Sequence, residues 1–102
     1  MALGIRLRGP YYCPVVVCDH CQQPIERAED GNYTWWGTTF TVPDGIAVMF
    51  FTHKDCTDVF EQTSGGFPGW RCLPLEAIPI LVLRNLGLTW QQSATCAALM
   101  GR

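Results

Sequence analysis

Positive charge is scarce in this sequence, and no long run of basic residues occurs. Charged residues make up 16% of the chain, and seven basic against nine acidic residues give a formal net charge of −2. A nucleic-acid-binding protein usually carries a basic patch or has a high isoelectric point. The sequence therefore disfavours nucleic acid as a partner. Nucleic-acid binding stays an alternative only if the basic side chains converge in space, namely Arg6, Arg8, Arg27, Lys54 and Arg71.

Long hydrophobic runs are also missing. The longest apolar stretch, residues 78–88, is interrupted by Pro79, Arg84 and Asn85 and is too short to cross a bilayer. The N-terminus has no extended apolar segment followed by a small-residue cleavage site, as a secretory signal would have. We therefore expect a soluble, cytoplasmic protein that has no membrane partner.

The rest of the composition is that of a small globular protein. A length of 102 residues is typical of one domain, so we expect residues 1–102 to form a single domain. Hydrophobic residues make up 48% of the chain, which argues against disorder. Because a domain of this size buries only a modest core, a bound metal or a partner chain would help to stabilise it.

The first half of the chain is rich in strand-like segments. Residues 3–8 alternate in polarity and predict an edge strand or a loose tail, and residues 11–17 predict a strand. The aromatic segment 33–42 and the apolar segment 46–51 flank Pro43-Asp44-Gly45, whose proline and glycine favour a tight turn. These two segments predict a β-hairpin.

A first helix is predicted directly after this hairpin. Thr52 and Asp55 have the spacing of a capping box, which predicts a helix over about residues 53–63. The glycines that follow end this helix, and a loop is expected over residues 67–72 because it contains a proline and a glycine.

Two more helices are predicted near the C-terminus. Residues 73–86 look mostly helical, and Pro79 is tolerated only in a first turn, so this helix is expected to begin near Ala77. Thr89 and the glutamine three residues later form a capping box before a helix over residues 90–100. We expect these two helices to pair as an αα-hairpin.

The residues that carry chemistry form two pairs separated by 31 residues: Cys18-x-x-Cys21 and His53-x-x-Cys56. Zinc takes four nitrogen or sulfur ligands at the corners of a tetrahedron. A Cys-x-x-Cys turn presents two thiolates to one point, and His53 and Cys56, three residues apart, share one face of a helix. This pattern predicts a structural Zn²⁺ site. The alternative is that the cysteines are buried as small apolar groups and the histidine is unrelated to them.

The order of the elements resembles that of the treble-clef zinc fingers. The Cys18–Cys21 turn, which we call the knuckle, is followed by a hairpin and then by two candidate ligands at the start of a helix. The resemblance rests on Cys18, Cys21, His53 and Cys56, and it covers residues 13–63. It implies an α+β fold with a zinc core, to which residues 73–101 add a helical extension. It does not imply a function, because such fingers bind DNA, RNA or proteins and some lie inside enzymes.

The other histidine and cysteines are given lesser roles. His20 lies between the two knuckle cysteines and is expected to point away from a metal that they share. Cys72 and Cys96 are expected to be buried core thiols. Cys13, five residues before the knuckle, is the one credible substitute ligand.

A redox protein is the second alternative. Cys18 and Cys21 could cycle between dithiol and disulfide, and residues 77–83 resemble the Ile-Pro segment that faces the active disulfide in the thioredoxin family. That fold requires a long helix directly after the motif. Residues 22–32 are instead short and polar and end in a turn signal, which disfavours this alternative.

We expect no enzymatic activity. Four protein ligands leave no open position on zinc for water or substrate. The His-x-Glu and Pro-Cys-x-x-Cys pattern of the cytidine deaminases is absent. Our hypothesis is a small structural zinc-binding protein that acts as a protein-interaction or scaffolding module. The low charge and high apolar fraction favour a protein partner or a homodimer, and no small-molecule substrate is implied.

Overall fold

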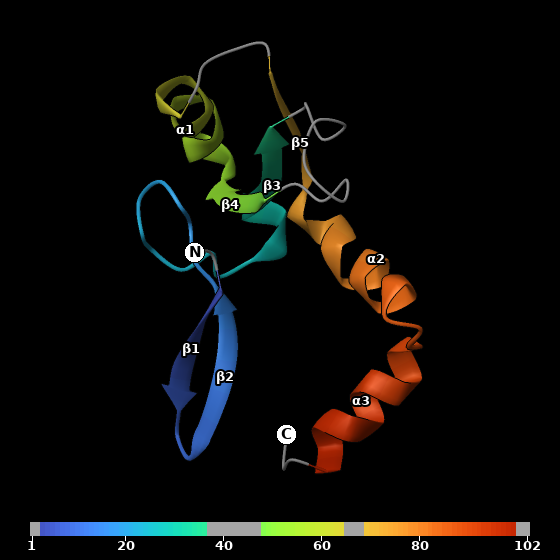
Figure 1. Cartoon of the computed structure of the whole chain (residues 1–102). Helices are drawn as coiled ribbons and strands as arrows, with labels where there is room; N and C mark the ends of the chain where they lie inside the picture. Colours follow the sequence, from blue (N-terminus) through green and yellow to red (C-terminus); the bar gives the residue numbers. More distant parts are fainter. Residues whose placement is uncertain (1–2, 37–47, 65–68, 100–102) are drawn as a thin grey trace.

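The computed structural model of the chain describes residues 3–36, 48–64 and 69–99. Within these ranges the chain is mixed α+β, with two small antiparallel sheets and three α-helices (Figure 1). No helix of the described ranges is long and apolar enough to cross a membrane. The strands are β1 (Leu3–Arg8), β2 (Tyr11–Val16), β3 (Gly31–Trp36), β4 (Met49–His53) and β5 (Trp70–Pro74), and the α-helices are α1 (Thr57–Thr63), α2 (Ile78–Asn85) and α3 (Trp90–Leu99).

The strands β1 and β2 form a hairpin of their own. They pair antiparallel with Leu3 opposite Val16 and Arg8 opposite Tyr11, and Gly9 supplies the positive φ of +59° that the turn requires. The predicted strand over residues 3–8 is confirmed, and the loose-tail alternative is wrong. The strand predicted over residues 11–17 is also present and ends at Val16.

The second sheet has the order β4-β3-β5, and both pairings are antiparallel. The predicted pairing of the segments that contain β3 and β4 is confirmed, whereas the turn Pro43-Asp44-Gly45 lies outside the described residues. The expectation of a loop over residues 67–72 is wrong for Trp70 onward, because β5 pairs with β3. The residue before β5 is Gly69, where a Cβ would overlap the indole of Trp36.

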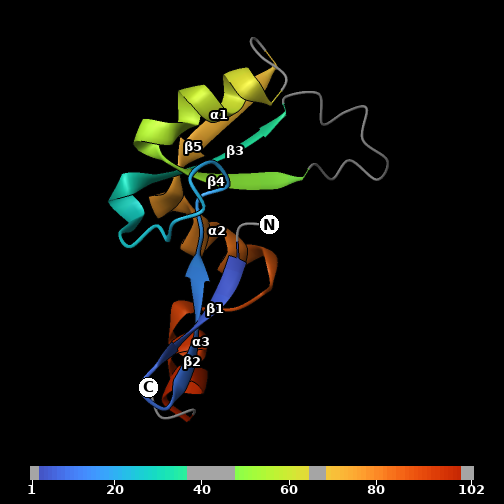
Figure 2. The ribbon, with the colours of Figure 1, turned by 90° about the vertical axis from the view of Figure 1, so that its left-hand side faces the viewer.

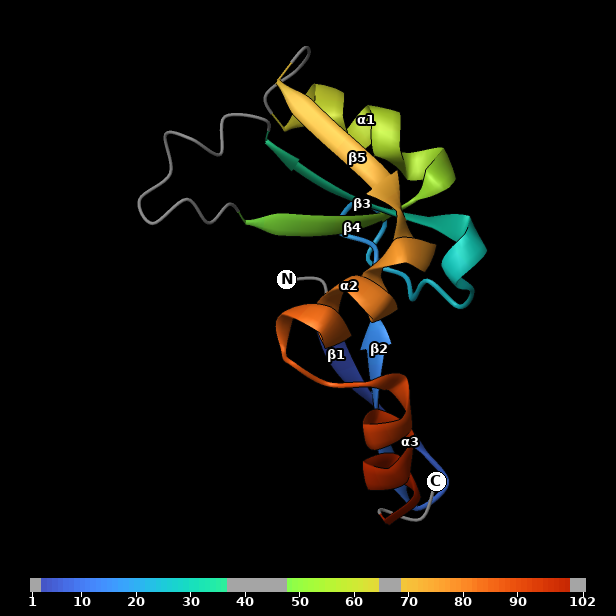
Figure 3. The same ribbon diagram turned by 90° about the vertical axis from the view of Figure 1, so that its right-hand side faces the viewer.

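The two faces of this sheet are covered by different elements. In Figures 2 and 3 α1 lies on one side of the sheet and α2 on the other. On the side of α2, Tyr33 and Phe51 join a buried core with Cys18, Ile25 and Leu75. On the side of α1, aromatic rings pack in tilted or edge-to-face pairs with centroids 5.3 to 6.0 Å apart, and they belong to Trp36, Phe50, Phe60 and Trp70.

The first helix begins later than the capping box predicted. A 3₁₀ turn, η4 (Lys54–Cys56), follows β4, and α1 begins at Thr57 without a side-chain cap. Thr52 is the buried fourth residue of β4, so its predicted role as an N-cap is wrong. Its hydroxyl instead lies 2.7 Å from the hydroxyl of Thr57.

The helices α2 and α3 begin close to where the sequence predicts. A 3₁₀ turn, η5 (Leu75–Ala77), precedes α2, and Pro79 lies in the first turn of α2. Gly87, at φ +71°, ends α2 with a bond from the N–H of Leu88 to the carbonyl of Leu83, the pattern of a Schellman cap. The capping box of α3 is confirmed, since the N–H of Gln92 donates to the Thr89 hydroxyl at 3.1 Å.

The predicted αα-hairpin is not formed. Figures 1 and 3 show that α3 does not fold back along α2 but extends away from the sheet, in the same direction as the β1–β2 hairpin. The described residues of α3 include none that is buried. The reason is visible in the sequence of α3, WQQSATCAAL, which has no continuous stripe of large apolar side chains to pack on α2.

Candidate metal centre

The first half of the centre is a tight turn that follows β2. The N–H of Gln22 donates to the carbonyl of Cys18 at 2.9 Å, and Gln22 has a left-handed φ of +65°. An isolated bridge between Val17 and Pro24 closes the loop behind the turn. The backbone therefore turns back on itself between Cys18 and Cys21 and brings their side chains to one side.

The second half lies where β4 runs into α1. His53 is the last residue of β4, and Cys56 is the last residue of η4. The turn between them is held by the buried hydroxyl of Thr57, which donates to the carbonyl of His53 at 3.0 Å and accepts from the side chain of Asn32 at 3.1 Å. Because this proton is already used, the hydroxyl of Thr52 must be the donor to Thr57.

Asp19 and Phe51 join the halves through a pair of hydrogen bonds. The N–H of Asp19 donates to the carbonyl of Phe51 at 2.7 Å, and the N–H of Phe51 donates to the Asp19 carboxylate at 2.9 Å. Phe51 lies two residues before His53 on β4. The knuckle is therefore fixed against the strand that delivers the third candidate ligand.

The structure brings all four predicted residues together. One ligand atom from each of Cys18, Cys21, His53 and Cys56 lies within 4.8 Å of all the others. In a tetrahedral site with Zn–S bonds of about 2.3 Å, neighbouring sulfurs are about 3.8 Å apart. The four ligand atoms are therefore close enough to hold a metal ion, and the donor set is consistent with zinc.

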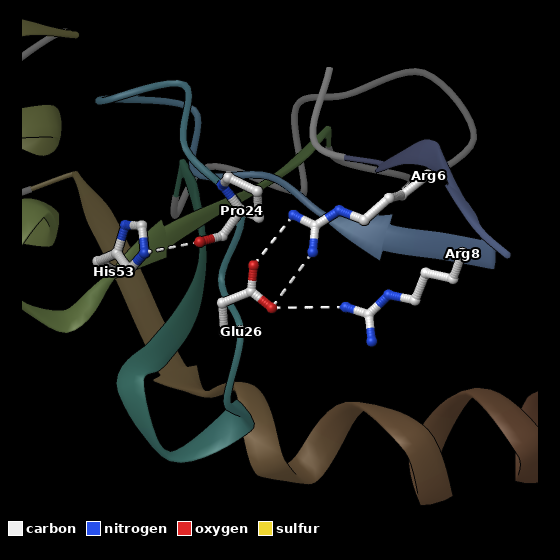
Figure 4. A network of polar contacts seen from close by, with 5 residues as sticks. All are labelled: Arg6, Arg8, Pro24, Glu26 and His53. Carbon is white, nitrogen blue, oxygen red and sulfur yellow. Dashed lines mark hydrogen bonds and ion pairs between the residues drawn. The ribbon is translucent and has the colours of Figure 1, made fainter.

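Contacts to both ring nitrogens orient the imidazole of His53 for this role. Nδ1 of His53 lies 3.3 Å from the sulfur of Cys21, whereas Nε2 lies 3.2 Å from the carbonyl oxygen of Pro24 (Figure 4). A carbonyl can only accept, so Nε2 carries the proton and Nδ1 presents its lone pair to the cluster. Histidines that bind metals are usually oriented through their other ring nitrogen in this way.

The thiol of Cys18 is surrounded by donors. Burial raises its pKa, but the N–H groups of Cys21, His53 and His20, together with the His53 side chain, outweigh burial and lower this pKa to about 6. Two of these donors are close: the N–H of His53 lies 3.4 Å and that of Cys21 3.5 Å from the sulfur. Cys18 is thus prepared to be a thiolate at neutral pH.

Cys56 has the opposite environment. Burial first, and then the sulfurs of Cys18 and Cys21, raise its pKa to about 12. Negative charge on neighbouring sulfurs opposes a further negative charge at this point. A divalent cation at the centre of the cluster would remove that opposition, which is the chemistry that a zinc–thiolate site supplies.

The remaining histidine and cysteines lie elsewhere. Among the described residues, neither His20 nor Cys13 is a member of the cluster. The prediction that Cys72 and Cys96 are core thiols is wrong, because both are exposed. Cys72 is on the edge strand β5, and Cys96 is on the uncovered helix α3.

Sequence reasoning missed the groups that position the ligands. Asp19 gave only a general signal, since aspartate is common in tight turns, and its bond to the N–H of Phe51, 32 residues away, could not be predicted. The carbonyl of Pro24 gave no comparable signal, because its partner His53 is distant in the sequence. Thr57 gave none either, because it bonds within a turn whose geometry the sequence does not predict. Both are nevertheless within hydrogen-bond distance of His53.

Most of the basic side chains that a nucleic-acid interface would use are engaged with carboxylates. Arg6 forms a two-pronged ion pair with Glu26 whose nearest N–O distance is 3.0 Å, and its guanidinium holds the pKa of that carboxyl below its usual value (Figure 4). The other ion pairs are Arg8 with Glu26, Arg27 with Glu29, and Lys54 with Glu76. These pairs weaken the case for a basic patch.

The redox alternative finds little support in the fold. In the described part of the chain, both sheets are antiparallel, and no α-helix lies between Cys21 and β3. A thioredoxin-like site requires a parallel βαβ context with a helix at the motif.

Comparison of the chain with protein-family models, with curated proteins and with solved structures finds no match.

Proposed function

We propose that this chain is a small zinc-binding protein in which Zn²⁺ has a structural role. The single observation that carries this proposal is the convergence of Cys18, Cys21, His53 and Cys56, whose ligand atoms all lie within 4.8 Å of one another. Three thiolates and one imidazole are a donor set that favours zinc over magnesium or calcium, which take oxygen ligands. The resemblance to treble-clef fingers points to the same ion.

A structural role fits this donor set better than a catalytic one. Four protein ligands fill the tetrahedron, whereas a catalytic zinc keeps one position for water or substrate. The centre also lies at a junction of the fold. It would tie the knuckle after β2 to the end of β4 and the start of α1, beside the core formed by Cys18, Tyr33 and Phe51.

The surface supports a function in protein interaction. Large apolar side chains are exposed on the β1–β2 hairpin and along α2 and α3, and they include Ile5, Leu86 and Trp90 at 67%, 66% and 64% exposure. A metal-braced core that carries such a surface is suited to act as an interaction or scaffolding module.

Native mass spectrometry of the purified protein tests the proposal. We expect one Zn²⁺ per chain in the wild type. The His53→Ala variant should lose the ion or bind it at least tenfold more weakly, because it removes one of four ligands. The matched His20→Ala variant should retain one ion, since His20 lies outside the cluster. Equal zinc content in the two variants, or no zinc in the wild type, would contradict the proposal.

A further inference from the structure

One face of the β1–β2 hairpin is entirely apolar. Leu3, Ile5 and Leu7 alternate on one face of β1, and the residues directly opposite them on β2 are Val16, Pro14 and Tyr12. The other face carries Arg6 and Arg8, which bind Glu26. Leu3, Ile5, Leu7 and Tyr12 are 58% to 75% exposed. We call these six residues the hairpin face.

The hairpin face borders an apolar groove of about 380 Å³. Leu3 and Val16 line it from the hairpin, Val82 and Leu83 from α2, and Trp90 from the first turn of α3. Figure 1 shows the hairpin and α3 as two arms that extend from the same side of the three-stranded sheet. The groove thus lies where the two arms meet the zinc core.

Neither arm is expected to be stable without a covering layer. An isolated two-stranded hairpin is marginal in water, and so is an isolated helix of ten residues such as α3. Both arms nevertheless have regular backbone hydrogen bonding in the structure. A further chain that covers them would supply the missing packing.

The chemistry of the uncovered surface limits the kind of partner. Between Leu73 and Leu99 the only charged residues are Glu76 and Arg84. On α3 the exposed residues around Ala94 and Ala97 are small, so the helix can approach a flat β-surface closely. A large apolar β-face and an uncharged helix with small side chains are complementary to each other, and this one chain carries both.

The exposed area agrees with a dimer. The chain exposes 7259 Å², whereas about 5,800 Å² is expected for a compact monomer of 11.4 kDa. The excess is about 1,500 Å² per chain, and two chains that covered all of it would bury about 3,000 Å² in total. Stable homodimers commonly bury about 2,000 to 5,000 Å².

We infer that two copies of this chain form a two-fold symmetric dimer in which α3 of each copy packs on the hairpin face of the other. The contact is the same on both sides, so the assembly closes at two copies rather than growing into a filament. This inference rests on the proposed function, because the zinc core holds the base of both arms.

Sedimentation equilibrium of the zinc-loaded full chain tests the inference. We expect a mass twice the 11.4 kDa of one chain. The Ile5→Lys variant places a charge in the hairpin face and should weaken dimerisation about a hundredfold or more. The matched Val59→Lys variant places the same charge on an exposed apolar position of α1, away from both arms, and should remain dimeric.

A second variant tests the same interface from α3, so that its result does not depend on the folding of the hairpin. Ala97→Lys keeps a strong helix former at an exposed position of α3 and should also give a monomer. Circular dichroism and zinc content are measured on every sample.

A zinc-loaded wild type that stays monomeric at about 100 μM, far above a micromolar Kd, would overturn the dimer and leave the proposed zinc site unaffected. Assemblies that grow beyond two copies, or a lysine variant that is folded and dimerises as tightly as the wild type, would also overturn it. Absence of zinc would instead overturn the proposed function.

Discussion

At the scale of single residues, the geometry of the candidate metal centre depends on groups other than the four candidate ligands. Asp19 binds the backbone of Phe51 in both directions, and the carbonyl of Pro24 fixes the tautomer of His53. Thr57 holds the turn that separates His53 from Cys56. Such contacts reduce the freedom that the ligands lose when a metal binds, and their loss commonly weakens metal binding tenfold or more.

The hydroxyl of Thr57 provides the sharpest test at this scale. Thr57→Val keeps the shape of the side chain but removes all three hydrogen bonds, which leaves the half-buried amide of Asn32 and the buried hydroxyl of Thr52 with one partner fewer. We expect the free energy of unfolding to fall by about 1–3 kcal/mol and zinc binding to weaken. Chemical denaturation and a competitive zinc titration measure these two effects.

Thr63→Val is the matched control. Thr63 is an exposed threonine of the same helix, and its hydroxyl only returns a bond to the carbonyls of Val59 and Phe60. Its loss should change stability by no more than a few tenths of a kcal/mol, as is usual for an exposed surface position. If both variants are equally stable and bind zinc equally well, the buried threonine network does not position the centre.

The sequence predicts the four candidate ligands because short-range spacing decides which side chains share one turn. Cys18 and Cys21 are brought together by one turn, and His53 and Cys56 by another. It does not predict how the two turns meet, since that depends on hydrogen bonds between residues 32 positions apart, such as Asp19 and Phe51. Thr52 is a second example of a feature that local spacing does not predict. It has the spacing of a helix N-cap, but its backbone is part of the strand β4.

At the scale of elements, the sequence best predicts the helix ends that depend on interactions between residues close in the sequence. Pro79 and Gly87 determine where α2 begins and ends, and Thr89 determines where α3 begins. The strand β5 was missed because it is held by pairing with β3, a contact between residues far apart in the sequence. The prediction of an αα-hairpin was wrong because helix pairing requires complementary faces on the two helices and not only a short loop between them.

The capping box of α3 gives a prediction at this scale. Thr89→Ala removes the side-chain acceptor for the N–H of Gln92, and we expect the helix to lose about 1 kcal/mol of stability. Because α3 has little packing of its own, this loss should appear as faster amide hydrogen exchange throughout the helix, while exchange in β3 is unchanged.

Thr95→Ala is the control for the cap. Thr95 is exposed in the middle of α3, and alanine has the higher helix propensity, so exchange in α3 should slow slightly. Identical exchange in the two variants would show that the capping box does not hold the helix.

At the scale of the whole molecule, the chain is more extended than a compact domain. Its radius of gyration is 15.3 Å, compared with about 13 Å for a compact chain of this length. The buried core is correspondingly small and lies beside the candidate metal centre, with Cys18 a member of both. We therefore expect the fold to depend on zinc, as it does in other small metal-dependent domains.

The most direct test of this claim is thermal unfolding of one zinc-loaded preparation with and without excess EDTA, followed by far-ultraviolet circular dichroism and tryptophan fluorescence. We predict a single cooperative transition for the loaded protein, loss of that transition after chelation, and its return when Zn²⁺ is added back. A transition that is unchanged by EDTA, in a protein that elemental analysis finds to be free of zinc, would contradict the account.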